Sequence, residues 1–352
     1  MSLIKEKKQI FNTLSSDFNG NYIKPLNFDE ICDYTEQVAK NFKSFLVRNE
    51  KGKPHFKVDE EFRIIYMTDK GDVRCADITE YAFSQLCTCL GLPASYVKKC
   101  FENGKEKLAL ANFRAWSGDI EKNLVFKEYQ GVIRGVVSEF YKGFSNARVC
   151  ETLRRSVDLN RYMAIQANVQ PDSLAIRFVE KDEIHIEGDK SPLWNGFMVT
   201  NNDVGGGALK ITDFLYRQWC TNGMTTPIFS GAALRKNHNA NDMQDGKILI
   251  FSKTIEKIST LKDEKIKLIN KAKGKTLNLD EYKMFTDKIS SNLRLSEQAT
   301  EDLKRIIVNE YSQDGRTTNW SVINGITQLG RDMNLDKRLE MEKYAGNILV
   351  AR

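Results

Sequence analysis

The chain has 352 residues, of which 41% are hydrophobic, and it carries 53 Lys and Arg against 47 Asp and Glu. This composition is typical of a globular protein, and its 6 Pro and 22 Gly exclude collagen-like and proline-rich architectures. The net charge of +6 permits a nucleic-acid partner without demanding one. No apolar run approaches the ~18 residues of a membrane-spanning helix, so we expect no membrane partner.

Cysteine usage and the first residues predict a cytoplasmic protein. The seven Cys are scattered, odd in number and without a CxxC pair, which favours reduced thiols over a disulfide framework. The N-terminal residues are mostly polar and charged, and they lack the apolar segment of a secretory signal.

The chain divides into three predicted segments. Residues 1–60 are polar and contain one helix, which opens at Asn27 and runs toward Phe45. Residues 61–245 form a core domain of helices and strands, bounded by turn signals. Its predicted elements are, in order, a hairpin of 63–68 and 73–78, helices over 81–90 and 94–109, a hairpin of 124–129 and 132–138, a helix over 146–158, and strands over 162–169, 174–179, 183–187, 196–200 and 209–220.

Residues 246–352 are expected to be helical and to pack on the core. A long helix runs from residue 246 to Gly274, with an apolar stripe on one face and Lys on the other. Further helices are predicted over 282–293, 297–311, 319–329 and 336–344. The whole pattern predicts an α+β fold, with a strand-rich antiparallel central body, flanking helices and a helical C-terminal part.

The positive charge is concentrated in two stretches. Residues 96–161 hold 13 Lys and Arg against 8 Asp and Glu, and residues 250–275 hold 8 Lys against 3. The first stretch also carries aromatic residues, and cations with rings suit a single nucleic-acid strand because cations contact phosphates while rings stack on bases. A half-buried sheet with Lys and Arg on its wet face produces the same pattern. The candidate phosphate contacts are Lys122, Lys127, Arg134, Lys142, Arg148, Arg154 and Arg155, and the candidate stacking residues are Tyr129 and Tyr141.

Motifs for catalysis and metal binding are absent from the sequence. His55, His185 and His238 are far apart, and there is no P-loop, no GxGxxG after a strand and no GxSxG. We therefore expect no cofactor and no metal. His185 lies between Glu183 and Glu187 on one face of a predicted strand, an arrangement that suits acid–base work or cation binding, and that is also the ordinary polar face of an edge strand.

The densest glycine cluster is Gly205-Gly206-Gly207, preceded by Asn201, Asn202 and Asp203. Consecutive glycine amides can form an anion-binding nest. The same glycines also allow a bulge or a close approach of two backbones. The sequence leaves both readings open.

This stretch carries a family resemblance. Residues 196–209, GFMVTNNDVGGGAL, and residues 220–224, CTNGM, resemble a family of phage/plasmid-like proteins of unknown function. That family has the patterns GxxxxNSxVGGxAL and CTNGM, and Asn202 stands here in place of Ser. Weaker agreement with the family occurs over residues 90–96, 134–146 and 319–327. In the second of these stretches, Ser145 replaces a customary Asp. The matched motif residues are Asn201, Gly205, Gly206, Gly207, Cys220, Asn222 and Gly223.

The resemblance implies a gene of a phage, plasmid or integrated element and action in the cytoplasm of a bacterial host. It implies structural roles for the glycine cluster and the Cys-Thr-Asn-Gly turn, and no catalytic residue can be transferred because the family has no settled activity.

Three functions remain as hypotheses. The first is binding or annealing of single-stranded DNA in recombination or replication, as a homo-oligomer, with RNA as an alternative ligand. The second is a non-enzymatic interaction protein that inhibits or redirects a host defence or replication enzyme. The third is an enzyme with an unusual site at His185 or at the glycine cluster.

Overall fold

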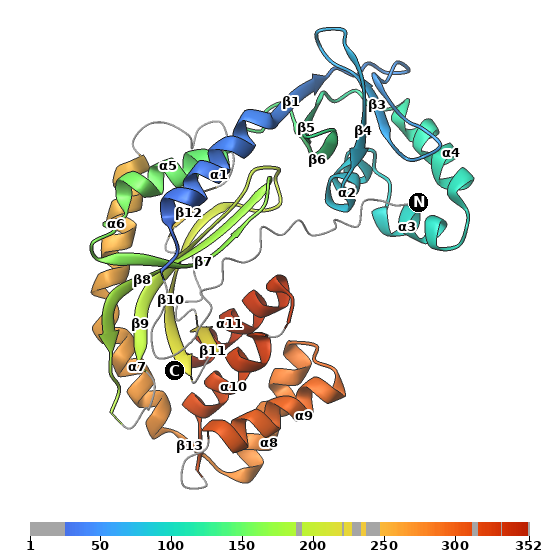
Figure 1. Ribbon diagram of the computed structural model, residues 1–352. Helices are drawn as coiled ribbons and strands as arrows, with labels where there is room; N and C mark the ends of the chain where they lie inside the picture. The colour runs from blue at the N-terminus through green and yellow to red at the C-terminus, as the bar shows by residue number, and fades with distance from the viewer. Residues whose placement is uncertain are drawn as a thin grey trace.

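The computed structural model describes residues 25–187, 192–219, 222–226, 234–236, 247–311, 316–331 and 333–350. Figure 1 shows a crescent in which a first sheet and its helices form one end, a second sheet forms the middle, and C-terminal helices form the other end. The fold is α+β, as predicted. No described helix combines the length and apolar character needed to cross a membrane.

The N-terminal lobe is built on a six-stranded sheet with the order β1-β5-β6-β4-β3-β2. Neighbouring strands are antiparallel except β4 and β6, which are parallel. Three helices complete the lobe. Its elements are β1 (Phe42–Val47), β2 (Phe56–Val58), β3 (Ile64–Met67), β4 (Val73–Ile78), α2 (Glu80–Cys89), α3 (Ala94–Glu102), α4 (Glu106–Ser117), β5 (Leu124–Tyr129) and β6 (Val132–Ser138).

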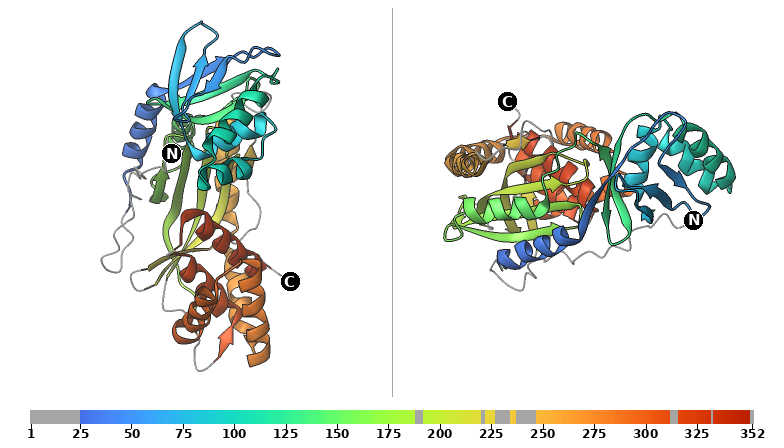
Figure 2. Two further views of the ribbon diagram at one scale, coloured as in Figure 1. Left: turned by 90° about the vertical axis from the view of Figure 1, so that its right-hand side faces the viewer. Right: turned by 90° about the horizontal axis from the view of Figure 1, so that it is seen from above.

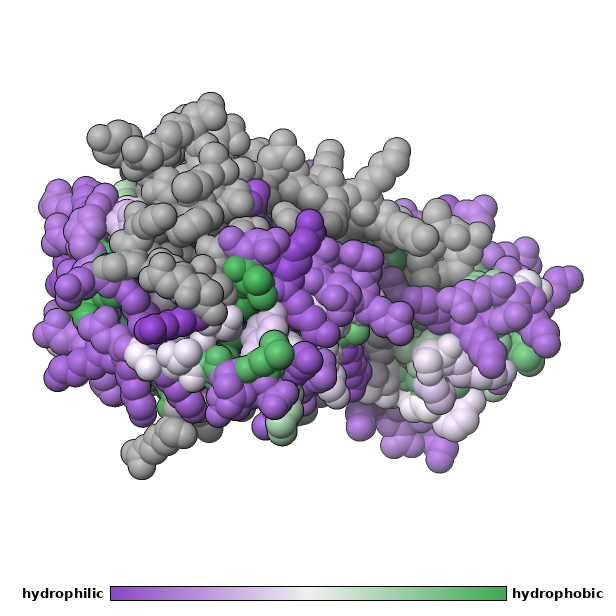
Figure 3. Space-filling model, turned by 90° about the horizontal axis from the view of Figure 1, so that it is seen from below, coloured by the Kyte–Doolittle hydropathy of each residue, from purple (hydrophilic) through white to green (hydrophobic). Residues whose placement is uncertain are grey.

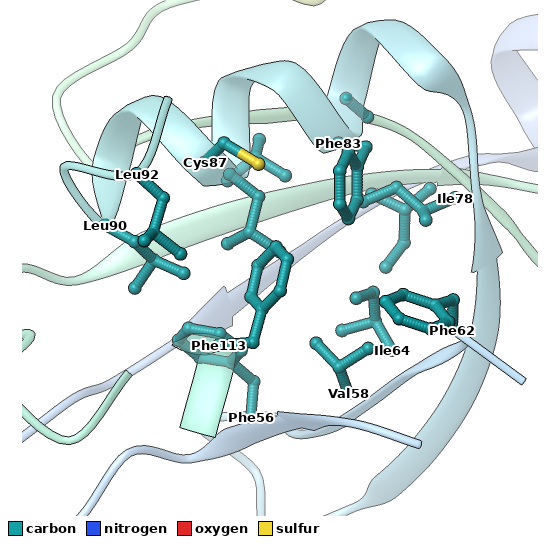
Figure 4. Packing of buried hydrophobic residues seen from close by; sticks show 14 of the residues in the cluster. Phe56, Val58, Phe62, Ile64, Ile78, Phe83, Cys87, Leu90, Leu92 and Phe113 are labelled. Atoms are coloured by element: carbon teal, nitrogen blue, oxygen red, sulfur yellow. The ribbon is translucent and has the colours of Figure 1, made fainter. Parts of the chain in front are cut away.

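The core of this lobe lies between the sheet and the three helices. Figure 4 shows Phe83 and Cys87 of α2 pointing toward Phe113 of α4, with Phe56 and Ile64 approaching from the strands. Thr79 caps α2, because its side chain accepts a hydrogen bond from the Ala82 amide.

Two predictions for this part of the chain are wrong in their boundaries. The helix that opens at Asn27, α1 (Phe28–Asn41), ends before Phe45, because residues from Phe42 onward pair with β5 instead. The predicted helix over 94–109 is two helices, since Gly104 takes a φ of +66° and ends α3. β1 and β2 also lie before residue 60 and pair with strands beyond it, so the first sheet draws on both of the first two predicted segments.

The body is an antiparallel sheet with the order β11-β10-β9-β8-β7, and β12 pairs with β10. Helices α1, α5 and α6 cover one face, where Ile176, Phe178 and Phe197 meet Leu153 and Phe251. Seen from above, α1 continues into β1, which passes from the body to the N-terminal lobe (Figure 2). The elements are α5 (Asn146–Ser156), β7 (Tyr162–Val169), β8 (Ser173–Ile184), β9 (Leu193–Asn202), β10 (Leu209–Trp219), β11 (Asn222–Thr226), β12 (Leu234–Lys236) and α6 (Lys247–Thr260).

The strands predicted over 174–179 and 183–187 form one strand, β8, which ends at Ile184. Its register with β9 shifts between Val179 and Glu183, so an irregularity lies where the sequence suggests a break. Helix α5 is capped by Ser145.

The C-terminal helices enclose a third core against the end of the second sheet, with Ile289, Leu303 and Ile323 packed near Leu193 and Leu215. The elements are α7 (Lys262–Gly274), β13 (Thr276–Leu277), α8 (Leu279–Asn292), α9 (Glu297–Ile306), the π-helix η2 (Ile307–Tyr311), β14 (Thr317–Thr318), α10 (Asn319–Arg331) and α11 (Leu335–Val350).

Two helix predictions in this region need correction. The long helix predicted from residue 246 to Gly274 is interrupted at Leu261, because α6 packs Ile255 and Ile258 against the second sheet whereas α7 packs Ile269 into the C-terminal core. The last helix continues to Val350, since Ala345 and Leu349 are buried.

Candidate nucleic-acid interface at the lobe junction

The N-terminal lobe and the body meet where the β9–β10 turn contacts β6 and α2. Val204 is fully buried there, and a Cβ at Gly135 would overlap the Cβ of Val204 and lie 2.9 Å from its Cγ1. Gln85 joins the two parts: its Nε2 donates to the Val204 carbonyl at 2.8 Å, and its Oε1 accepts from the Val136 amide at 2.9 Å. We call this contact region the lobe junction.

The glycine cluster belongs to this junction. The Asn202 Oδ1 accepts from the amides of Val204 at 3.1 Å and Gly206 at 2.6 Å. Gly205 has a φ of +88°, a conformation that favours glycine. The Asn202 side chain thus takes the place that an anion would occupy in a nest, and the loop has a structural role.

The other motif residues support the same corner or lie apart from it. Asn201 is buried, and its Nδ2 donates to the Phe144 carbonyl at 2.7 Å and to Asn146 Oδ1 at 2.8 Å. Gly207 is half-buried with no close neighbour for a Cβ. Asn222 and Gly223 lie on β11, opposite residues of β10. Cys220 lies outside the described residues.

Three of the predicted site residues are brought together at this junction. The Lys127 Nζ lies 5.8 Å from the centroid of the Tyr141 ring. The Tyr141 hydroxyl donates to the Asn202 carbonyl at 3.4 Å. Arg134 forms an ion pair with Asp172 of the β7–β8 turn, with 3.3 Å between Nη2 and Oδ1. The basic stretch and the glycine cluster, which the sequence analysis treats separately, therefore lie together at the lobe junction.

Strand alternation explains the orientation of the β5 side chains. Phe126 and Glu128 point into the N-terminal lobe, so Lys127 and Tyr129 lie on the opposite face, both half-buried. The Tyr129 ring stacks on Phe42, with 6.1 Å between centroids.

Burial dominates the electrostatics of the lobe junction. Desolvation raises the pKa of Asp203 to about 6, against the opposing effect of Lys127 and with a smaller contribution from Asp172 in the same direction. Desolvation likewise raises the pKa of Tyr34, Tyr81 and Tyr141 above the ordinary tyrosine value. The Gln85 Nε2 also donates to the Tyr81 hydroxyl at 3.2 Å, which places this ring at the junction, and Tyr34 interacts electrostatically with Tyr129 and Arg134.

Sequence reasoning missed Tyr34, Tyr81, Gln85 and Asp172 as members of this site. They come from α1, α2 and the β7–β8 turn, and no local spacing connects them with β5. Their proximity is a consequence of tertiary structure.

The remaining predicted basic residues lie elsewhere. Arg154 on α5 pairs with Asp29 at 3.1 Å, Asp33 at 3.3 Å and Glu36 at 3.6 Å, all from α1. Arg155 pairs with Glu151 one turn earlier. Both charges are paired with carboxylates, and Arg154 joins α5 to α1.

Arg148, Lys122 and Lys142 are exposed. Arg148 lies over the Phe144 ring at 5.3 Å. Lys122 precedes β5 and Lys142 follows β6, which places both at the same end of the hairpin, near the 77%-exposed Phe140.

The predicted cluster at His185 is an exposed polar edge. His185 Nε2 lies 3.3 Å from Glu183 Oε2, and the side chains are 76% and 42% exposed. Glu187 accepts from Lys273 through its main-chain carbonyl. Ile184 and Ile186 are buried between these residues, which gives the alternation of a half-buried edge. Within the ranges that the structure covers, no three His, Cys, Asp or Glu gather as metal ligands.

Comparisons with protein-family models, with curated proteins and with solved structures each found no match. The resemblance to phage/plasmid-like proteins therefore stays a prediction that rests on the motif residues.

Proposed function

We propose that this chain is a cytoplasmic protein of a phage, plasmid or integrated element that binds single-stranded nucleic acid at the lobe junction, in recombination or replication. The observation that carries the proposal is the position of Lys127 beside the rings of Tyr34, Tyr81, Tyr129 and Tyr141, next to the ion pair of Arg134 and Asp172. Cations beside partly accessible rings are the arrangement that single strands require, since cations contact phosphates and rings stack on bases.

Lys122 and Lys142 extend this surface along one end of the β5–β6 hairpin. With Lys127 they provide three phosphate contacts. A single strand that releases counterions from three contacts gives a log–log salt slope of about −2. Assembly into a homo-oligomer along the strand belongs to the same proposal, and cooperative binding isotherms would support it.

The test is equilibrium binding of a fluorescent single-stranded oligonucleotide over a series of salt concentrations. Tyr81→Ala is expected to weaken binding about 5- to 150-fold, because loss of one base–ring stack costs about 1–3 kcal/mol. Lys127→Gln is expected to reduce the salt slope by about 0.7.

Matched controls separate the lobe junction from the rest of the lobe. Tyr96 on α3 is 40% exposed and Tyr81 is 41% exposed, so Tyr96→Ala removes an equally accessible ring away from the junction and should leave binding unchanged. Lys57→Gln on β2 serves the same purpose for charge. No affinity of the wild-type chain for any oligonucleotide at moderate salt, or equal losses from both tyrosine variants, would contradict the proposal.

A second candidate is a host-protein partner, for which Phe140 offers an apolar contact because its ring is 77% exposed. Seen from below, however, the hydrophobic residues of the described surface form small separate groups within a hydrophilic face (Figure 3). Phe140→Ser distinguishes the two functions. Loss of a stoichiometric, nuclease-resistant host partner with unchanged oligonucleotide affinity would favour the protein partner.

A further inference from the structure

Helix α4, at one end of the crescent (Figure 1), carries apolar residues on its outer side as well as on its buried side. The buried side packs into the core of the N-terminal lobe through Ala109, Leu110 and Phe113. On the outer side, Leu108 is 48% exposed and Trp116, two turns further on, is 46% exposed. Ala111 and Ala115 are also exposed there. A helix whose outer side meets only water carries polar residues on that side, so this side of α4 is suited to a partner.

Helix α3 supplies a second exposed ring beside these residues. Tyr96 is 40% exposed, and its hydroxyl accepts from Asn112 Nδ2 at 3.3 Å. Asn112 lies on α4, one turn from Leu108 and one turn from Trp116. The Trp116 ring packs over the turn between α2 and α3, where a Cβ at Gly91 would lie 3.7 Å from its Cζ3. We call the surface made by these exposed side chains the α3–α4 face, and its members are Tyr96, Leu108, Ala111, Ala115 and Trp116.

Positive charges border the α3–α4 face. Lys107 and Arg114 lie on α4 beside the exposed alanines, and Lys99 lies one turn after Tyr96 on α3. All three cations are exposed, and within the described part of the chain their side chains form no ion pair. Glu106, the carboxylate of α4, precedes the buried Leu110 by one turn and so lies on the other side of the helix.

These features together select a class of partner. The apolar strip runs from Leu108 to Trp116, more than two helical turns, and it matches the apolar stripe of a second helix, which would pack against it as helices do in a bundle. Cations along the edges favour carboxylates on that helix through complementary charge. A nucleic-acid strand matches the face less well, because the aliphatic side chains at its centre provide no ring on which a base can stack.

We propose that the α3–α4 face binds an acidic amphipathic helix of a partner protein. Leu108 and Trp116 make the central apolar contacts, and Lys107 and Arg114 pair with carboxylates of the partner helix. The proposal is independent of nucleic-acid binding at the lobe junction, because the α3–α4 face shares no residue with that region. It is also separate from Phe140, which follows β6.

The experiment is selection of peptides on the full chain from a yeast-displayed library of random peptides, each about four helical turns long. Peptides that bind the wild-type chain and not the Leu108→Gln variant are collected. Gln keeps a high helix propensity and Leu108 is exposed, so the variant should retain its fold. We expect the collected peptides to be rich in Asp and Glu and to carry apolar residues at the helical spacing i, i+3 or i+4, and i+7.

A selected peptide, synthesised with a fluorescent label, then gives affinities by anisotropy. Trp116→Ala is expected to weaken binding about 30-fold, and Leu108→Gln about 5- to 30-fold, because both remove central apolar contacts. Lys107→Gln should weaken binding about 2- to 5-fold and make it less dependent on salt, since charges at the edge of an interface contribute little each.

Matched controls lie on α8, at the opposite end of the crescent (Figure 1). Leu279 is 65% exposed and Lys288 is exposed, so Leu279→Gln and Lys288→Gln repeat the two changes away from the α3–α4 face and should keep the full peptide affinity. The proposal is overturned if the selection yields only neutral or basic peptides, or if no peptide distinguishes the wild-type chain from Leu108→Gln.

A single-stranded oligonucleotide tests the other class of ligand on the same variants. We expect Trp116→Ala and Leu108→Gln to leave oligonucleotide affinity unchanged, and Tyr81→Ala to leave peptide affinity unchanged. If Trp116→Ala lowers oligonucleotide affinity as much as Tyr81→Ala does and no acidic peptide is selected, the α3–α4 face is a nucleic-acid surface and the proposed protein partner is wrong.

Discussion

Gly135 sets how closely β6 approaches the β9–β10 turn. A methyl group at this position would overlap Val204, whose side chain is fully buried. We expect Gly135→Ala to lower the free energy of unfolding by about 1–3 kcal/mol, the usual effect of overpacking, as measured by urea denaturation. Gly274→Ala is the control, because a methyl group there meets nothing within 4 Å.

Addition of Val204→Gly in the Gly135→Ala background removes the overlapping atoms. The two changes together should therefore destabilise the chain less than the sum of their separate effects. Strict additivity would show that the two residues do not meet.

Asp203 makes stability depend on pH. Its pKa is raised to about 6 in the folded chain, against about 3.9 for an unfolded aspartate, so the folded state binds more protons between these values. The contribution of Asp203 to stability is therefore fully present below about pH 4. This contribution is lost as the pH rises through about 6. Asp203→Asn should remove this fall, which has a slope of at most about 1.4 kcal/mol per pH unit.

Urea denaturation at pH values from 4 to 7 measures the Asp203 effect. Asp287→Asn is the control, because the Asp287 side chain is 69% exposed and pairs with Lys304 at 3.8 Å. A wild-type slope retained in Asp203→Asn would contradict the assignment.

Among the helices, α7 is fixed by a buried ion pair. Lys265 is fully buried, and its Nζ lies 3.2 Å from Asp213 Oδ2 and 2.7 Å from Asn195 Oδ1. Desolvation lowers the pKa of Lys265 and raises that of Asp213. We expect Lys265→Met to lower the free energy of unfolding by about 3–5 kcal/mol, because it leaves Asp213 buried without its partner.

The double variant Lys265→Met/Asp213→Leu tests the cause of that loss. If the unpaired carboxylate is responsible, most of the stability should return in denaturant titrations, since two apolar residues need no charge partner. A double variant that is less stable than Lys265→Met would instead assign the pair a direct stabilising role.

Helix α5 is held on α1 by Arg154, which contacts three carboxylates. We expect Arg154→Gln to lower the Tm, and to do so less at high salt, where these exposed pairs are screened. Oligonucleotide affinity should change less than twofold. A large loss of oligonucleotide affinity with an unchanged Tm would show that Arg154 belongs to the binding surface.

Secondary-structure elements were predictable where one local signal dominates. The β5–β6 hairpin follows alternation on both sides of Gln130-Gly131, both of which have positive φ, and α2 follows its cap at Thr79. Predictions failed where tertiary contacts decide. The first residues of β1 were predicted to continue the preceding helix, but they pair with β5. Helix α6 ends where the packing changes from the second sheet to the C-terminal core.

At the scale of the whole molecule, the candidate interface forms because the N-terminal lobe contacts the body. Lys127, Arg134 and Tyr141 were identifiable from composition along the chain, but their neighbours Tyr81 and Asp172 reach them only through folding. The glycine cluster was recognisable as a motif, yet its role as the contact with Gly135 required the structure. The buried ion pair of Arg177 and Glu342 has no sequence signal either, because the two residues come from distant elements.

Whether a single strand lies on the lobe junction can be tested by photo-cross-linking of a 5-iodouracil oligonucleotide, followed by mapping of the adducts by mass spectrometry. We expect adducts on tyrosines of the lobe junction, foremost Tyr81 on α2 and Tyr141 after β6, and we expect these adducts to be lost at high salt. Adducts confined to α8 and α9, with none at the junction, would contradict it.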